Sequence, residues 1–223
     1  MRLLLFDIDG TLLLTNGGGQ GALEIALTSE FGVKSPDTDI SYSGRTDRSI
    51  FDELLERNGL DPTETHRSRL ASQYSRLLPE VLNERGGRIL PGVSKLLQAV
   101  QDHEDLIPYV MTGNLESTAT TKLKYFGLTD FFCGVFGGQH DLQRNDLARR
   151  TANSLANEYG SNSLDIVVIG DTPADVDCGH AIGAKAIAVC TGSYDRPALE
   201  TTNPLAVCDD LSKVPDIMRL LAK

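Results

Sequence analysis

The stretch Leu3-Leu4-Leu5-Phe6-Asp7-Ile8-Asp9-Gly10-Thr11 decides how this 223-residue chain is interpreted. Its apolar half predicts a short buried strand, and two acidic residues follow at the strand's end. Side chains two positions apart in an extended backbone point the same way, so Asp7 and Asp9 are expected to project together. Adjacent carboxylates repel each other unless a cation lies beside them, and Mg²⁺ takes such oxygen ligands. The alternative is a polar strand end that runs into an Asp-Gly turn.

The composition is that of a globular protein, with 40% hydrophobic and 23% charged residues. The length allows one large domain, or a domain with an insert. A formal net charge of −10 argues against nucleic acid or an anionic membrane as a partner, since both require a positively charged surface. The charge is compatible with a small phosphorylated metabolite, whose binding site needs only local positive charge.

Cysteine spacing and the N-terminal residues bear on the compartment. The four cysteines form no CxxC pair, so neither a zinc site nor a disulfide framework is indicated, and reduced thiols are expected. The first apolar run stops at Asp7, which is too short for the core of a signal peptide. No stretch approaches the ~20 apolar residues of a membrane span. A cytoplasmic protein is therefore expected, and its oligomeric state is left open.

Further short apolar runs predict buried strands at residues 106–111, 134–136, 166–169 and 186–189. Between and around these runs lie helical patterns at residues 93–100, 115–126, 146–159 and 172–183. Alternation of strand and helix predicts an α/β fold in which helices cover both faces of a parallel sheet.

Residues 15–88 contain no convincing strand, and helical patterns cover 20–31 and 47–58. A third helix is expected to open at Asp61-Pro62-Thr63-Glu64 with Asp61 as its N-cap, and Pro79 should kink or divide it. We therefore expect two domains: a core of residues 1–14 and 89–223, and an inserted helical cap of residues 15–88. The run Gly17-Gly18-Gly19 is interpreted as a hinge between them.

A second polar site follows the strand expected at 106–111, in the sequence Val110-Met111-Thr112-Gly113-Asn114. A hydroxyl group beside the first amides of a helix is well suited to hold a phosphate oxygen. The alternative is that Thr112 and Asn114 only end a strand and cap a helix.

A third polar site is Ile169-Gly170-Asp171-Thr172-Pro173-Ala174-Asp175-Val176-Asp177. The strand brings Asp171 to the same sheet edge as Asp7, and Asp175 follows one helical turn later. The dipole of a helix favours acidic residues at its N-terminus, but this explains one carboxylate better than three. Together with Asp7 and Asp9, these residues predict a metal site.

With these three motifs, the chain resembles the haloacid dehalogenase-like hydrolases, in particular the phosphatase branch that carries a helical cap and includes phosphoglycolate phosphatase-like proteins. The motifs DIDGT, MTGN and GDTPAD occur at residues 7–11, 111–114 and 170–175, in the order and spacing of that family, and the resemblance covers nearly the whole chain. It implies a Rossmann-like core with sheet order 5-4-1-2-3 and a site at the carboxyl ends of the strands.

The resemblance also implies residue roles. Asp7 would attack phosphorus to form an aspartyl-phosphate, and Asp9 would act first as general acid and then as general base. Mg²⁺ would bind the carboxylates of Asp7 and Asp171 and the backbone carbonyl of Asp9, with Asp175 as a further ligand or a partner of coordinated water. Thr112 would be a catalytic phosphate-binding residue, with Gly113 and Asn114 beside it.

The function implied is a Mg²⁺-dependent phosphomonoester hydrolase of a small phosphorylated metabolite. A sugar phosphomutase and a non-catalytic binding protein of the same fold are the alternatives.

Two arginines complete the predicted site. The resemblance implies a lysine after the third strand, but residues 137–147 contain none. Arg144 falls at the best-matching position and is assigned a catalytic role, although guanidinium geometry differs from that of an ammonium; the alternative is a solvated loop residue. Arg45, in the stretch Ser43–Asp47, is expected to bind a carboxylate or second phosphate of the substrate, or else to be a surface arginine.

Overall fold

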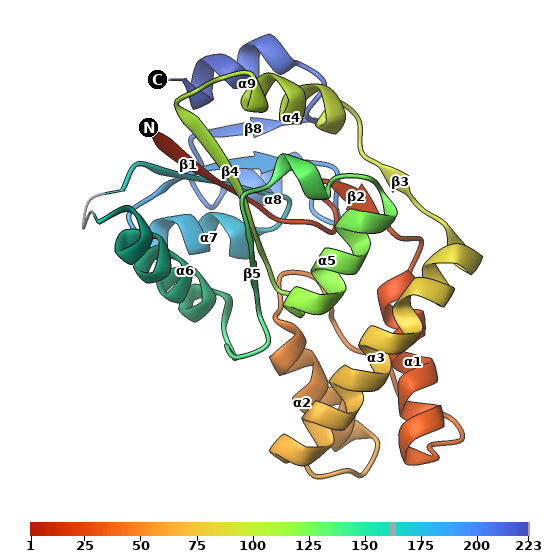
Figure 1. Ribbon diagram of the computed structural model, residues 1–223. Coiled ribbons are helices and arrows are strands. Elements are labelled where there is room, and N and C mark those ends of the chain that lie inside the picture. Colours follow the sequence, from red (N-terminus) through yellow and green to blue (C-terminus); the bar gives the residue numbers. More distant parts are fainter. Residues whose placement is uncertain (161–163, 223) are drawn as a thin grey trace.

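A six-stranded parallel sheet forms the centre of the computed structural model, which describes residues 1–160 and 164–222 (Figure 1). The strand order is β5-β4-β1-β6-β7-β8. The strands are β1 (Arg2–Phe6), β4 (Leu106–Thr112), β5 (Val135–Gly137), β6 (Ile166–Gly170), β7 (Lys185–Val189) and β8 (Ala206–Cys208). The first five are the predicted strands, and they follow the implied order when the sheet is traversed from β7 to β5. The observed sheet differs from the implied five-stranded order in one respect: a sixth strand, β8, extends it beyond β7 and was not predicted.

Two helical layers cover the sheet because the strands bury both of their faces. In β1, Leu4 and Phe6 pack in the cluster with α4 (Val93–Gln101), α5 (Glu116–Tyr125) and α9 (Val214–Leu221). Leu3 and Leu5, which point the other way, pack with α6 (Arg144–Tyr159), α7 (Pro173–Ala181) and α8 (Arg196–Glu200). This alternation within one strand is the expected consequence of period-two side-chain geometry, and it confirms the predicted α/β class.

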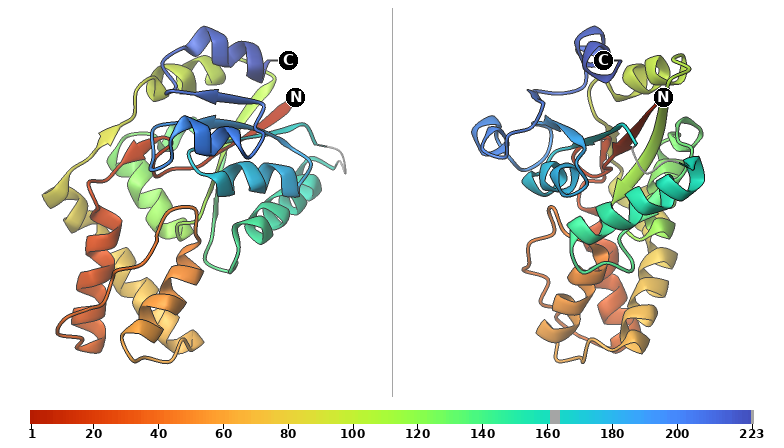
Figure 2. Two further views of the ribbon diagram at one scale, coloured as in Figure 1. Left: turned by 180° about the vertical axis from the view of Figure 1, so that it is seen from behind. Right: turned by 90° about the vertical axis from the view of Figure 1, so that its left-hand side faces the viewer.

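Three helices form a separate group below the sheet: α1 (Gly18–Phe31), α2 (Asp47–Arg57) and α3 (Glu64–Arg85). They share their own apolar cluster, and both views of Figure 2 show them at the end of the molecule opposite the two termini. The short antiparallel pair β2 (Leu13–Leu14) and β3 (Arg88–Ile89) lies where the chain enters and leaves this group. The proposed division into core and cap falls at this pair and stays a prediction.

The start and continuity of α3 differ from prediction. Its N-cap is Thr63, whose hydroxyl accepts a hydrogen bond from the His66 amide, so Asp61 as N-cap was wrong. The helix also runs unbroken through Pro79, so a division there was wrong. Leu78 and Leu82 lie on its buried face in the cluster shared with α1. Tertiary packing thus offsets the one backbone hydrogen bond that a proline removes.

Most of the Gly17–Gly19 run, which was predicted to be a hinge, lies inside helix α1. Gly17 is the N-cap of α1 in the left-handed region, with φ 75°, whereas Gly18 and Gly19 belong to the first turn of the helix. Its role as a hinge stays a prediction. Within the described residues, no helix is long and apolar enough to cross a membrane.

Candidate active site

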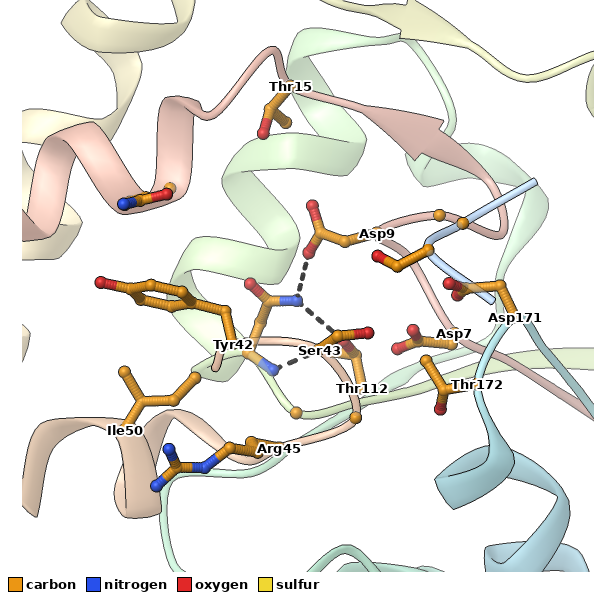
Figure 3. A pocket seen from close by; sticks show the side chains of 18 of the residues that line it. Asp7, Asp9, Thr15, Tyr42, Ser43, Arg45, Ile50, Thr112, Asp171 and Thr172 are labelled. Carbon is orange, nitrogen blue, oxygen red and sulfur yellow. Dashed lines mark hydrogen bonds between the residues drawn. The ribbon is translucent and has the colours of Figure 1, made fainter. Parts of the chain in front are cut away.

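Three strand ends meet under the helical group. Asp7 follows β1, Thr112 ends β4, and Asp171 follows β6. Because Phe6 is in parallel register with both Val110 and Ile169, the residues that follow emerge side by side. They line a cavity of about 760 Å³ that extends to α1 and α2. In Figure 3, Asp7, Asp9 and Asp171 approach this cavity from the sheet side, and Tyr42 and Ile50 line the wall opposite.

The carboxylates of Asp7, Asp171 and Asp175 form a buried acidic cluster, with one oxygen of each within 4.8 Å of the others. Burial raises the pKa of Asp7 to about 6, although the charge of Arg144 opposes the shift. Burial and the negative charges of Asp175 and Asp7 raise the pKa of Asp171 to about 8. Asp7 Oδ1 is buried and accepts no hydrogen bond from any described residue. Such a cluster suits a cation, which would relieve repulsion between the carboxylates that Arg144 compensates only in part.

The turn after Asp7 is built around Asp171. Gly10 has φ +88°, and a Cβ atom there would overlap the carboxylate of Asp171. The next residue, Thr11, is completely buried and donates its hydroxyl to Asp171 Oδ1 at 2.9 Å. The Gly-Thr pair of the first motif therefore lets the turn pass close to the carboxylate of the third and fixes one of its oxygens.

Both oxygens of Asp175 are already engaged. Oδ2 accepts hydrogen bonds from the amide (3.0 Å) and the hydroxyl (2.7 Å) of Thr172, which closes the capping box of α7. Oδ1 pairs with the guanidinium of Arg144. Because both oxygens are engaged, direct ligation of a metal by Asp175 is the less favoured of the two predicted roles, and its role as a partner of coordinated water stays a prediction.

Arg144 begins α6 and is buried beside the predicted nucleophile. Its Nη2 lies 3.4 Å from Asp7 Oδ1 and also pairs with Asp175. Although burial opposes the charge, the carboxylates of Asp175 and Asp7 raise the pKa of Arg144 above its ordinary value. A permanent cation therefore lies at the nucleophile, and the description of Arg144 as a solvated loop residue does not hold.

The loop after β4 connects the second motif to Asp9. The Asn114 side-chain amide donates to Asp9 Oδ2 and to Thr112 Oγ1, both at 2.8 Å (dashed lines in Figure 3). Asn114 therefore holds the predicted general acid as well as lying at the predicted phosphate-binding loop. Thr112 is completely buried and lines the cavity with Gly113.

The segment before α2 is docked directly on this loop. The Asp47 amide donates to the Gly113 carbonyl at 2.7 Å, and the Leu115 amide donates to Asp47 Oδ2 at 2.7 Å. A Cβ atom at Gly113 would overlap the backbone carbonyl of Arg45. Only glycine permits this close approach. Burial raises the pKa of Asp47 to about 7.

The side chain of Arg45 does not extend toward the carboxylates; in Figure 3 its guanidinium points away from Asp7 and Asp9. It pairs with Glu53 and donates to the carbonyl oxygens of Ser49 (2.9 Å) and Ser41 (3.1 Å). The structure thus ties the guanidinium to α2 and its preceding segment, and substrate contact by Arg45 stays a prediction.

Lys122 is a site residue that the sequence interpretation missed. Its side chain is only 3% exposed, and its Nζ donates to Asp9 Oδ2 at 2.6 Å and to Asn114 Oδ1 at 2.7 Å. In sequence, Lys122 occupies the face of α5 that also carries Ala119 and Leu123. A lysine among buried positions of an amphipathic helix is the signal that could have identified it.

The parallel sheet, the acidic residues at its carboxyl edge and the helices that follow the first strand define an α/β protein with its site at the ends of the strands. Residues 4–189 match the family of haloacid dehalogenase-like hydrolases, and the chain belongs to that family. The resemblance inferred from the three motifs is therefore confirmed.

Known proteins similar to the chain include both phosphatases and a mutase. It is 27% identical to phosphoglycolate phosphatase of Rhodospirillum rubrum over 96% of this chain and 90% of the relative. The structure of CbbY from Rhodobacter sphaeroides in complex with phosphate has a TM-score of 0.74 and 16% identity, over 96% of each chain. That of β-phosphoglucomutase from Clostridium difficile has a TM-score of 0.72 and 17% identity over both complete chains. The family and its curated relatives support the expected enzyme of the phosphatase branch.

Proposed function

We propose that this protein is a Mg²⁺-dependent phosphomonoester hydrolase that acts on a small phosphorylated metabolite through an aspartyl-phosphate on Asp7. One observation carries the proposal: Asp7 Oδ1 is buried without a hydrogen-bond donor among the described residues, yet lies 3.4 Å from the Arg144 guanidinium. A nucleophile requires such a lone pair, and an anionic substrate requires the adjacent positive charge.

The acidic cluster fits a hard divalent cation. Its ligand atoms are all carboxylate oxygens, one of which has no hydrogen-bond partner among the described residues, and burial raises the pKa values of Asp7 and Asp171. Asp7, Asp171 and the backbone carbonyl of Asp9 would hold Mg²⁺, and Asp175 would maintain Arg144 and α7. When bound, the ion supplies charge that offsets the repulsion between the anionic nucleophile and the phosphate.

The positions of the side chains support the following reaction. Asp7 attacks phosphorus, the bond to the leaving oxygen breaks, and Asp9 donates a proton to that oxygen. In the second half, Asp9 accepts a proton from the water that attacks the aspartyl-phosphate, which releases phosphate and regenerates Asp7. Thr112 and the amides of Gly113 and Asn114 bind phosphate oxygens, while Arg144 stabilises the charge in transfer.

The helical group is the part of the molecule that encloses the substrate. Tyr42, in the segment before α2, and Ile50, in α2, line the cavity on this side, so we propose that residues 15–88 form a cap that excludes water during the reaction. The relatives named above make 2-phosphoglycolate the first substrate to test. We also place the enzyme in the cytoplasm, which agrees with its four unpaired cysteines.

Phosphate release from p-nitrophenyl phosphate and a panel of phosphorylated metabolites, with Mg²⁺ or EDTA, tests the proposal. Release should need Mg²⁺ and disappear in Asp7→Asn, which keeps the size of the side chain but removes the nucleophile. Release that survives this substitution would overturn the role of Asp7. The mutase alternative rests on the structural similarity to β-phosphoglucomutase, and product analysis with a hexose 1-phosphate separates the two: an isomeric sugar phosphate indicates a mutase, and free phosphate a hydrolase.

A further inference from the structure

Helix α5 begins at the predicted phosphate-binding loop without an N-cap side chain of its own. Its N-cap residue is Leu115, which has no side-chain oxygen to accept a hydrogen bond from the first turn. The carboxylate of Asp47, 68 residues earlier in the chain and at the start of α2, satisfies one of the free amides at this end: its Oδ2 accepts the Leu115 amide at 2.7 Å. A negative charge at the N-terminus of a helix is also favoured by the helix dipole.

Asp47 holds the backbone on both sides of Asn114. Its carboxylate accepts the amide of the following residue, Leu115, and its own amide donates to the carbonyl of the preceding residue, Gly113, at 2.7 Å. The Asn114 carbonyl accepts the Gly138 amide, also at 2.7 Å. The backbone of Asn114 is therefore fixed by a residue of the helical group and by the loop after β5.

The side chain of Asn114 transmits this constraint to Asp9. Its amide nitrogen donates to Asp9 Oδ2 at 2.8 Å (Figure 3). Its carbonyl oxygen accepts from Lys122 Nζ, which donates to the same Asp9 oxygen at 2.6 Å. Because both bonds to Asp9 end on one oxygen, they set the rotation of the carboxyl group. The orientation of Asp9 therefore depends on where the backbone places Asn114.

We propose that Asp47 is a positioning residue for the general acid. It fixes the backbone of Asn114, and Asn114 holds Asp9 in the orientation from which it protonates the leaving oxygen. This inference rests on the proposed function, because it takes Asp9 as the general acid. The alternative is that Asp47 only fastens α2 to the core, in which case its loss would weaken the fold without a specific effect on the proton transfer.

A misplaced general acid has a kinetic signature that a weakened fold lacks. The proton from Asp9 matters most when the leaving oxygen would otherwise depart as a strongly basic anion. Phenolate is such an anion, whereas p-nitrophenolate is stabilised by its nitro group and departs with little help. The value of kcat/KM covers the steps up to this departure, so it excludes the later hydrolysis of the aspartyl-phosphate, which is the same for both substrates. Phenyl phosphate and p-nitrophenyl phosphate are therefore a matched pair.

Asp47→Ala tests the proposal with these two substrates. We expect kcat/KM to fall by about 10- to 100-fold for phenyl phosphate and by less than about 3-fold for p-nitrophenyl phosphate, as for a catalytic group that is displaced by about 1 Å. Asp47→Asn keeps an oxygen that can accept the Leu115 amide, so it should restore the wild-type ratio of the two values. Asp52→Ala is the control, since Asp52 lies on the same helix and pairs with Arg67 of α3; this variant should leave the ratio unchanged.

The outcomes separate positioning of Asp9 from attachment of α2. Equal losses for the two substrates in Asp47→Ala would show that Asp47 only fastens the helix, and would overturn the proposal. A selective loss that Asp47→Asn does not restore would overturn the route through the Leu115 amide. Asp47→Leu, which resembles aspartate in shape but accepts no hydrogen bond, replaces the alanine variant if that one fails to fold.

The side-chain amide protons of Asn114, followed by NMR, distinguish failure of this inference from failure of the proposed function. Their signals should shift in Asp47→Ala and return toward the wild-type positions in Asp47→Asn, whatever the turnover. Shifted signals in the alanine variant, without turnover of either substrate by the wild type, would support the link from Asp47 to Asn114 and reject the hydrolase. Unchanged signals in the alanine variant would reject the inference even if the wild type is an active phosphatase.

Discussion

Arg144 shows how one side chain serves two carboxylates. One nitrogen of its guanidinium, Nη2, faces both Asp7 and Asp175, and the charge of the group is permanent. A lysine at the same backbone position has one compact ammonium group on a shorter stem. Arg144 is therefore suited to couple the nucleophile to the N-terminus of α7, which Asp175 caps.

The first prediction is that Arg144→Ala lowers kcat/KM by about 10²- to 10³-fold, because it removes the charge beside the transferring phosphoryl group. Arg144→Lys should retain part of the activity, since charge remains but contact with both carboxylates does not. Steady-state kinetics with Mg²⁺ measure both effects. Arg149→Ala, at an exposed arginine of the same helix, should leave kcat/KM unchanged. Equal activity of the alanine and lysine variants would contradict an electrostatic role.

Acidic residues that follow an apolar run at a strand end could be predicted from the sequence, whereas Lys122, on a helix face, could not. Asp7 and Asp171 each follow an apolar run, and parallel strands bring such positions to one edge. Lys122 contacts Asp9 although the two are 113 residues apart in sequence, a contact that only the packing of α5 against the sheet creates. The link between Asp47 and Leu115 depends in the same way on how the helical group docks.

At the scale of elements, strong local patterns were predictable and short peripheral elements were not. The strands β1, β4 and β6 are central and nearly all apolar, so their sequences alone indicate burial. The edge strand β8 has three half-buried residues, too few for a pattern to be distinguished from a loop. At the start of α3, both Asp61 and Thr63 are good N-cap residues, and local sequence did not select between them.

The second prediction concerns the contact between the segment before α2 and the loop after β4. Gly113→Ala places a methyl group against the Arg45 carbonyl, which is backbone and cannot turn aside. We expect a loss of about 1–3 kcal/mol in the free energy of unfolding and a rise in KM, because the predicted phosphate-binding loop must shift. Denaturant unfolding and kinetics measure the two effects.

Gly127→Ala provides the contrast for that substitution. Gly127 has φ +68°, so alanine there is strained, but its Cβ would meet no atom of the described residues within 4 Å. It should lose stability while activity is unchanged. A Gly113→Ala variant with wild-type KM would show that the docking of this segment does not set the geometry of the site.

At the scale of the whole molecule, three buried carboxyl groups with raised pKa values and a formal net charge of −10 both lower the stability of the fold as pH rises. The pKa values of Asp7, Asp47 and Asp171 are raised to about 6, 7 and 8, above the value of about 3.9 in an unfolded chain. Between these limits the folded protein binds more protons than the unfolded chain. Their contribution is therefore present at low pH and is lost as pH rises through the folded values.

The third prediction follows from this charge balance. In EDTA, the free energy of unfolding should fall as pH rises from about 5 to 8, because each of these carboxyl groups must ionise in a buried position. Added Mg²⁺ should reverse the loss, and its stabilising effect should grow over the same range, since protons compete with the metal for Asp7 and Asp171. Thermal unfolding at pH 5.5 and pH 8, with Mg²⁺ or EDTA, measures both trends. Asp171→Asn should remove the response to Mg²⁺ but leave the part of the pH dependence that belongs to Asp7 and Asp47. A response to Mg²⁺ that is larger at pH 5.5 than at pH 8 would show that the ion binds elsewhere than the buried acidic cluster.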